Sequence, residues 1–434
     1  MPTKSPITEY TQQVIDGGSP IRAMFDREKE MINQGLNPIG MSLGNPDIKP
    51  PKEYFDALRE AVALAERSPI NLNQYPPNAG FPKTRNRVAE EMEERFEVPF
   101  GIEGVIMTAG AANALDVFLA TLIDPVLYSP RDKPTKNRPS IRDGSMSVSG
   151  AVRPDEVIVP APFFVEYCHY IKQNQAEPIV VPCDEDSEIN PDKVKEAITS
   201  KTRAILINSP NNPTGKIYSK KNLDDLAEVL TEASEKHGCR VVCMEDRPYD
   251  RLAFGGVDVP SMLSLYPDTV YITSFSKSLG LAGERIGYMA IPKHFFGEHR
   301  DAFLNALVIN LRTKCINAPV LQQLAIEILG TNVTSNVKKY EERTRRVEKV
   351  LNETGFECLS PEGGFYLWAR MPRVFESPEH FMKTAHNRQS PLLYTPGHGF
   401  GGPSYKNFIR LSTCVSESTI ERACKEIPRI VQAA

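Results

Sequence analysis

Short runs of hydrophobic residues alternate with longer helix-like segments from about residue 104 to residue 291. Most of these runs are rich in Val and Ile, are bounded by Pro, Gly or Asp, and are too short to be core helices. They lie at residues 105–108, 157–160, 179–182, 204–207, 241–244, 270–273 and 286–291. Between two of them, residues 222–237 place Leu and Ala at helical spacing. The alternation predicts an α/β fold, with a mostly parallel sheet covered by helices on both faces.

The C-terminal part has a different pattern. Residues 300–355 have a charge-rich helical pattern, short strand-like segments follow at 364–370 and 407–412, and a last helix is expected at 417–431. This pattern predicts a smaller α+β domain, and we expect the first 45 or so residues to pack with it. The predicted division is a large domain at 46–299 and a small domain made of 1–45 and 300–434.

One segment, residues 126–154, interrupts this alternation. It is polar, rich in Pro, Ser and Arg, and without periodicity. A loop of this length is unusual inside a compact domain. Two interpretations remain open: an insertion on the surface, or a loop over the entrance of an active site or at the edge of a dimer.

Composition narrows the class of protein. The 434 residues are 41% hydrophobic, and 51 Lys and Arg against 55 Asp and Glu give a net charge of −4, which argues against a nucleic-acid binder with a basic face. No apolar run reaches the ~18 residues of a membrane span, and the N-terminus has no signal-peptide core. None of the eight cysteines forms a CxxC pair or a zinc-like cluster, so no metal site is predicted. We expect a cytoplasmic enzyme with reduced thiols and a small-molecule substrate.

The strongest chemical signal directly follows the run at 270–273. It reads Ser274-Phe275-Ser276-Lys277, and Arg285 comes eight residues after the lysine. Small hydroxyl side chains and a guanidinium can hold a phosphate. A lysine among them is placed to form a Schiff base with a carbonyl group.

Two further motifs follow predicted strands. Residues 208–215, NSPNNPTG, contain Asn212, and residues 245–249, EDRPY, contain Asp246 and Tyr249. Each motif taken alone is typical of a turn or a solvated loop. Ligands bind at the carboxyl ends of the strands in an α/β sheet, where all three motifs are expected to meet.

Together these residues resemble the class I/II aminotransferases, fold-type-I pyridoxal-phosphate (PLP) enzymes related to aspartate aminotransferase. The resemblance runs from Ser42-Leu43-Gly44-Asn45-Pro46 to Phe408-Ile409-Arg410-Leu411-Ser412. Further matching motifs are Tyr75-Pro76-Pro77-Asn78-Ala79-Gly80, Thr108-Ala109-Gly110-Ala111-Ala112, Pro160-Ala161-Pro162-Phe163-Phe164, Gly363-Gly364-Phe365-Tyr366 and Pro396-Gly397-His398-Gly399-Phe400-Gly401. The resemblance implies a large domain with a mixed, mostly parallel sheet and a smaller α+β domain.

The resemblance also implies the activity and the cofactor. The enzyme would move an amino group between an amino acid and a 2-oxo acid, with PLP held by Lys277 as a Schiff base. Lys277 would then act as the general base, while Asp246 pairs with the ring nitrogen of the cofactor. Tyr249 and Asn212 would bond its phenolate oxygen, and Phe164 would stack on its ring. The residues implied for its phosphate are Gly110, Ala111, Ala112, Ser274, Ser276 and Arg285.

The resemblance also implies which residues bind the substrate and which partner the chain has. Arg410 resembles the arginine that holds the substrate α-carboxylate, which suits the bidentate fork of a guanidinium, and Asn212 and Gly44 would lie beside it. Tyr75 resembles a tyrosine that reaches the phosphate of the other subunit. The resemblance thus implies a homodimer with shared active sites and no nucleic-acid or membrane partner.

Some positions depart from the family pattern or leave alternatives open. Ala112 stands where some aspartate-using relatives carry a lysine for a second carboxylate, which weakens the case for a dicarboxylate as the main amino donor unless an arginine from elsewhere takes the place of that lysine. Arg247 is either a surface residue or one that tunes the site. The same scaffold also hosts eliminations, cyclisations and oxidations of amino acids, so a PLP enzyme that does not transaminate is the alternative. A regulator with an aminotransferase-like domain is disfavoured, since only about 40 residues precede Gly44, too few for a winged helix.

Overall fold

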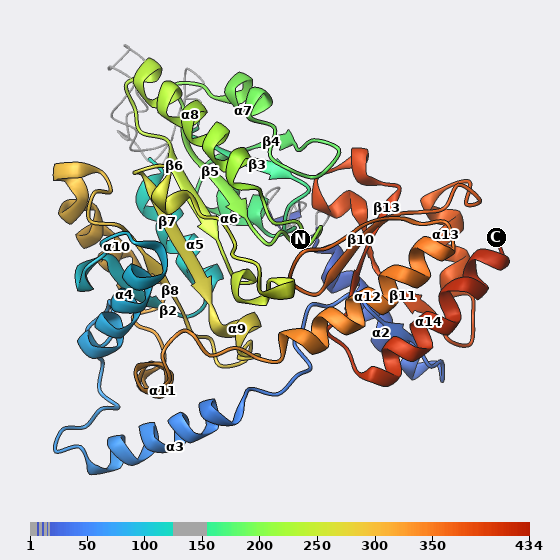
Figure 1. Ribbon diagram of the computed structural model, residues 1–434, viewed down its shortest axis with the longest axis horizontal. Coiled ribbons are helices and arrows are strands. Elements are labelled where there is room, and N and C mark those ends of the chain that lie inside the picture. The colour runs from blue at the N-terminus through green and yellow to red at the C-terminus, as the bar shows by residue number, and fades with distance from the viewer. Residues whose placement is uncertain (1–6, 8–10, 13–14, 16–17, 125–153) are drawn as a thin grey trace, which may run out of the picture.

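The hydrophobic runs in the middle of the chain form one seven-stranded sheet (Figure 1). The computed structural model describes residues 7, 11, 12, 15, 18–124 and 154–434. The insertion predicted at 126–154 therefore lies, except for Pro154, outside the described residues. The sheet order is β2-β8-β7-β6-β5-β3-β4. Its strands are β2 (Val105–Thr108), β3 (Glu156–Ala161), β4 (Glu177–Pro182), β5 (Thr202–Asn208), β6 (Val242–Asp246), β7 (Thr269–Ser274) and β8 (Gly287–Ala290).

Strand direction confirms the predicted mixed, mostly parallel sheet. Strands β4, β3, β5, β6 and β7 pair in parallel, whereas β8 runs antiparallel to both β7 and β2. All seven predicted runs are strands, with ends displaced by at most two residues. Backbone pairing continues past the hydrophobic residues at some ends, as at β6, which extends to the polar pair Glu245 and Asp246, and stops short of them at others, as at β8.

Helices cover both faces of this sheet, and alternate residues of each strand decide which helix they meet. In β5, Ala204 and Leu206 belong to the core beneath one group of helices, while Ile205 and Ile207 belong to the core on the opposite face. The first group is α5 (Ala111–Leu122), α6 (Tyr167–Gln173) and α10 (Arg300–Lys314). The opposite face is covered by α7 (Pro191–Ala197) and α8 (Lys220–His237), and by α3 (Lys52–Arg67), α4 (Pro82–Phe96) and α11 (Val320–Leu329).

A second, four-stranded sheet lies to the right in Figure 1, in the order β12-β13-β10-β9. Its strands are β9 (Glu357–Leu359), β10 (Tyr366–Arg370), β12 (Thr395–Pro396) and β13 (Phe408–Ser412). Around it lie α2 (Pro20–Asn33), α12 (Val337–Glu353), α13 (Pro378–His386) and α14 (Glu417–Gln432). The predicted strands at 364–370 and 407–412 and the last helix are confirmed.

The N-terminal segment packs with these C-terminal elements. Strand β1 (Ile39–Gly40) pairs in parallel with β11 (Leu392–Leu393). Ile39 and Met41 are buried in the same hydrophobic core as Val347 of α12. The packing predicted for the first 45 residues is therefore observed for this part of them. The domain boundaries themselves stay a prediction.

Three strands end side by side in the main sheet, and their ends place the chemistry. Strand β5 ends at Asn208, β6 ends at Asp246, and β7 ends at Ser274, directly before the short helix α9 (Phe275–Ser278). None of the eight cysteines forms a disulfide bond, and the described residues include no cluster with metal-ligand composition. Within the described ranges, no helix combines the length and hydrophobicity of a membrane span.

Candidate active site

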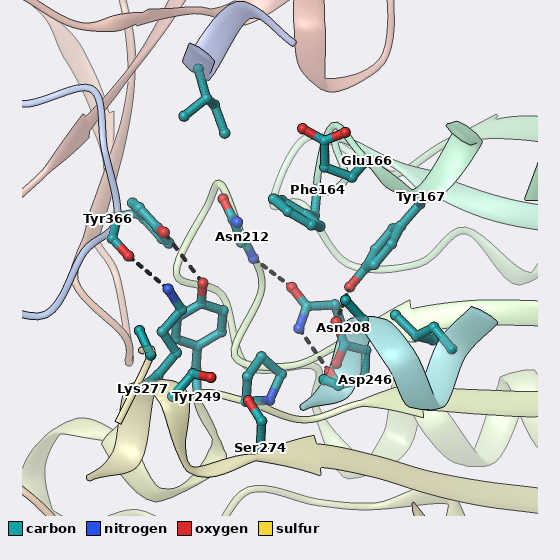
Figure 2. A pocket seen from close by; sticks show the side chains of 18 of the residues that line it. Phe164, Glu166, Tyr167, Asn208, Asn212, Asp246, Tyr249, Ser274, Lys277 and Tyr366 are labelled. Atoms are coloured by element: carbon teal, nitrogen blue, oxygen red, sulfur yellow. Dashed lines mark hydrogen bonds between the residues drawn. The ribbon is translucent and has the colours of Figure 1, made fainter. Parts of the chain in front are cut away.

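A cavity of about 320 Å³ opens at the carboxyl ends of these strands (Figure 2). It is lined by residues that are far apart in the sequence, because strand ends, helix starts and the C-terminal sheet converge there. The predicted site residues along its wall are Gly44, Ala111, Ala112, Phe164, Asn212, Asp246, Tyr249, Ser274, Ser276, Lys277, Arg285 and Arg410. Gly110 lies directly before two of them and is packed against Arg285.

Asp246 is a buried carboxylate with one satisfied oxygen. The Tyr167 hydroxyl donates to its Oδ2 at 2.6 Å, while Oδ1 is buried without a hydrogen-bond partner among the described residues. Burial raises the pKa of Asp246 to about 7, against the lowering effects of the Tyr167 hydrogen bond and the Lys277 charge. The free oxygen is thus available to a donor that enters the cavity.

Two asparagines tie the loop after β5 to the end of β6. The Asn208 side-chain amide donates to the backbone carbonyl of Asp246 at 2.8 Å, and its oxygen accepts the Asn212 backbone N–H at 2.7 Å. This pair holds the Asn212 side chain against the cavity, as Figure 2 shows. The predicted turn residue is therefore fixed by its neighbour Asn208.

Lys277 is held at the first turn after β7. Its Nζ donates to the Gly44 carbonyl at 2.6 Å (Figure 2). Burial lowers the pKa of the Lys277 amine, and the nearby Arg410 and Arg285 guanidinium groups lower it further. The sequence prediction anticipated the effect of the positive charges, whereas desolvation is the larger cause.

Arg410 is fully buried and lines the same cavity. Its Nη1 donates to Asn212 Oδ1 at 2.9 Å, and its Nη2 donates to the Ser42 carbonyl at 2.6 Å. Its Nε has no hydrogen-bond partner among the residues described. The guanidinium also lies 4.3 Å from the centre of the Tyr366 ring. An unpaired donor on a buried cation attracts an anion.

A second positive region lies at the start of α5. The first amides of this helix, at Ala111 and Ala112, have no carbonyl partners within the helix, and the helix dipole favours an anion there. Arg285 lies beside them and donates to the Ala109 carbonyl at 3.0 Å and to the Ser276 hydroxyl at 3.4 Å. Gly110 has φ +90°, and a Cβ there would come within 2.5 Å of Arg285 Nη2, so only glycine leaves the region open.

Tyr75 and Arg247 are not part of the cavity wall. Tyr75 does not line the cavity, and 80% of its surface is exposed. Arg247 is buried, so its interpretation as a surface residue is wrong. Its guanidinium donates to the carbonyls of Pro260 and Val259 and pairs with Glu245 at 3.4 Å, away from the cavity wall. Arg247 thereby connects the end of β6, which carries Asp246, to the segment that contains Val259 and Pro260.

The sequence prediction missed several residues of the wall. Tyr167 follows Phe164 by three residues, and spacing alone does not show that its hydroxyl reaches Asp246. Tyr366 was part of a matched motif without a role; its hydroxyl accepts a hydrogen bond from the Tyr249 hydroxyl at 3.3 Å. The other unanticipated wall residues are Ile21, Leu43, Leu115, Glu166, Tyr170, Asn208, Pro248 and Ala282.

Comparisons with known proteins agree with this geometry. The model of the family described as aminotransferase class I and II matches residues 140–427. The aspartate aminotransferase of Bacillus subtilis is 27% identical over 427 residues, covering 94% of this chain and 95% of its own length. The probable aspartate/prephenate aminotransferase of Aquifex aeolicus is 28% identical, covering 96% and 95%. A crystal structure of an amino transferase from Eubacterium rectale is similar with a TM-score of 0.84 at 26% identity, covering 99% of both chains.

The chain therefore belongs to the aminotransferase class I and II family. It has the fold-type-I architecture, and it is a PLP-dependent aminotransferase.

The residues present fit that cofactor. The partnerless Asp246 Oδ1 matches a protonated ring nitrogen, and the amides at the start of α5 with Arg285 and Ser276 match a phosphate. The lysine between these two regions has the lowered pKa that carbonyl chemistry requires. These requirements are met within one cavity.

Proposed function

We propose that this cavity is the active site in which the chain moves an amino group between an amino acid and a 2-oxo acid, with Lys277 as the residue that carries the cofactor. One observation supports this above all. A lysine with a lowered pKa, a buried carboxylate with a free oxygen and a buried arginine with a free N–H meet in one cavity.

The cofactor-binding residues are proposed from the same geometry. Ala111, Ala112, Ser274, Ser276 and Arg285, with Gly110 before them, bind its phosphate. Asp246 holds the ring nitrogen in its protonated state, Asn212 and Tyr249 donate to the phenolate oxygen, and Phe164 packs on the ring. When bound, PLP supplies an aldehyde that condenses with amines and a ring that accepts electron density from the substrate α-carbon.

Arg410 binds the substrate, and Lys277 transfers its proton. Arg410 binds the α-carboxylate through its fork and thereby fixes the direction of the Cα–H bond, with Asn212 and the Gly44 backbone beside it. Burial and two arginines lower the pKa of Lys277, which favours the neutral amine that can take the proton from the substrate α-carbon and hold it at Nζ. The Gly44 carbonyl orients its Nζ.

We propose two domains and a closure between them. The large domain comprises 46–299, and the small domain comprises 1–45 and 300–434. Leu43 and Arg410, which line the cavity, come from the proposed small domain, and Asp246 and Lys277 come from the large one. Closure over the substrate would exclude water and strengthen the pairing of Arg410 with the carboxylate.

We propose a cytoplasmic homodimer in which Tyr75 contributes to the partner's active site. Tyr75 is exposed, and the nearby α3 carries the exposed apolar side chains Phe55, Val62 and Leu64. Apolar side chains grouped on one protruding helix are typical of an interface. Figure 1 shows α3 at the lower edge of the molecule, where a second copy has access to it.

The proposed lysine is tested by chemical trapping. Borohydride reduction of the PLP-loaded enzyme should attach the cofactor to the peptide that contains Lys277, and mass spectrometry identifies that peptide. Lys277→Ala should bind PLP without covalent trapping. A label on another lysine would overturn the assignment.

The reaction is tested without assuming a substrate. Purified enzyme is mixed with each proteinogenic amino acid in turn, and the absorbance of the cofactor is followed for conversion to pyridoxamine phosphate. At least one amino acid should convert it, and added 2-oxo acid should restore it. Products formed without conversion of the cofactor would instead indicate an elimination or cyclisation.

A further inference from the structure

Glu166 places a carboxylate at the cavity that the proposed transamination does not use. It lines the cavity and is half-buried. It stands at the position before helix α6, yet its side chain makes no capping hydrogen bond, and no hydrogen bond or ion pair to its carboxylate occurs among the described residues. In Figure 2 it lies beyond Phe164, far across the view from Lys277.

The charges around the cavity single out this residue. The positive groups are Lys277, Arg285 and Arg410, and the negative groups are Asp246 and Glu166. In the proposed function, the three cations and Asp246 serve the cofactor and the substrate α-carboxylate. Within the described part of the wall, Glu166 is therefore the one charged group without a proposed role, and it is available to bind the substrate side chain.

The lining of this cavity suits a long side chain with a polar end. Ile21, Leu43 and Leu115 contribute apolar wall to the same cavity, which favours methylene groups. An unpaired carboxylate at such a wall attracts a cation and repels another carboxylate. An acidic side chain would meet no uncommitted cation among the described wall residues.

We propose that Glu166 is a specificity-determining residue that selects amino donors whose side chains end in a positive charge, an ammonium or a guanidinium. This inference rests on the proposed function, because it takes Arg410 as the site of the α-carboxylate. The substrate then spans the cavity, with its α-carboxylate at Arg410 and its cationic end at Glu166. The apolar wall covers the methylene groups between them.

The test compares matched donors in matched variants. For each enzyme, kcat/KM is measured with L-arginine, L-lysine, L-norleucine and L-glutamate. The variants are Glu166→Gln and, as a control, Glu196→Gln, which removes an exposed carboxylate on α7. In the unmodified enzyme, arginine or lysine should exceed both norleucine and glutamate.

Glu166→Gln should lower the preference for arginine over norleucine roughly two- to fivefold, the effect of a partly shielded charge pair. Glu196→Gln should leave the ratio unchanged. Glu166→Lys should reverse the order and favour glutamate over arginine. An unmodified enzyme that prefers glutamate, or a ratio that Glu166→Gln does not alter, would overturn the inference.

A binding measurement separates recognition from catalysis. 5-Guanidinopentanoate is arginine without its α-amino group and cannot react with the cofactor, and pentanoate lacks the guanidinium. The difference in dissociation constant between the two, followed by the absorbance of bound PLP, should shrink in Glu166→Gln and persist in Glu196→Gln. If no amino acid at all converts the cofactor, the proposed function fails; if norleucine or glutamate converts it best, only the inference about Glu166 fails.

Discussion

Two opposing effects act on the single carboxyl group of Asp246. Burial raises its pKa to about 7, and the hydrogen bond from Tyr167 at 2.6 Å opposes that rise. The proposed role requires the charged form, since only a carboxylate keeps the bound ring nitrogen protonated. Tyr167 is therefore a positioning residue that acts through Asp246.

Tyr167→Phe should shift the pH dependence of the enzyme. Without the donor, the charged carboxylate is less favoured, so the pKa of Asp246 moves further up and activity is lost at a higher pH during acidification. A hydrogen bond to a charged group contributes about 1.5–3 kcal/mol, which corresponds to about one to two pH units. The measurement is the acidic limb of the kcat/KM profile, with PLP saturating.

Tyr54→Phe is the matched control for this prediction. Tyr54 is also buried, and its hydroxyl donates to Gln322 at 3.0 Å, outside the cavity wall. Its loss should affect stability without moving the acidic limb. A limb that stays in place in Tyr167→Phe would show that this phenol does not support the charge on Asp246.

For single residues, the sequence predicts the site residues that follow the strands but not the hydrogen bonds that hold them in place. Lys277, Asp246 and Asn212 were predicted because each follows a hydrophobic run. Tyr167 and Asn208 were missed, because hydrogen bonds between different strands and helices depend on the assembled sheet. Glu166 gave no signal, since a glutamate before a short helix is typical of a solvated position.

At the scale of elements, the start of α5 depends on a glycine with a positive φ and on the positive charge of Arg285 beside it. Gly110 precedes the helix with φ +90°, and Ala111 and Ala112, which follow it, line the cavity together with Arg285. The sequence predicted the glycine as part of a motif. A Cβ at this position would lie 2.5 Å from Arg285 Nη2, so a side chain there would have to displace the arginine.

Gly110→Ala should weaken PLP binding, because the new methyl group displaces Arg285 and strains the turn. We expect the dissociation constant for PLP to rise about tenfold or more. Gly255→Ala is the control, because Gly255 also has a positive φ of +64° but open space around it, so only backbone strain is added. Both variants are measured by fluorescence titration of the apoenzyme with PLP. Equal PLP affinity in the two variants would contradict the proposed phosphate site.

Most elements of the main sheet were predictable, because each strand carries hydrophobic residues on both faces. In β5, alternate side chains enter two different cores, which is why the whole run is apolar. The pairs β1–β11 and β12–β13 were not predicted. Strands of two residues have no readable period, and their partners are distant in the sequence.

At the scale of the whole molecule, the proposed dimer gives a role to two features that have none within a single chain: the exposed Tyr75 and the exposed apolar side chains of α3. Tyr75 is 80% exposed although its motif matches a family site, and α3 carries exposed apolar side chains. If Tyr75 acts in the partner's site, its exposure in one chain follows from the assembly. The sequence alone could not decide this, because the residues of an interface resemble other surface positions.

Complementation between two inactive variants tests the shared site directly. One chain carries Tyr75→Ala and the other carries Lys277→Ala, and the two are co-expressed with different affinity tags. In a mixed dimer, the Tyr75→Ala chain keeps its own Lys277 and receives Tyr75 from its partner, so one site is intact and the other has both defects. Random pairing should therefore restore about a quarter of the wild-type activity, and the purified mixed dimer about half. If Tyr75 instead acts within its own chain, every site contains one defect, and the mixed dimer should be no more active than its parents.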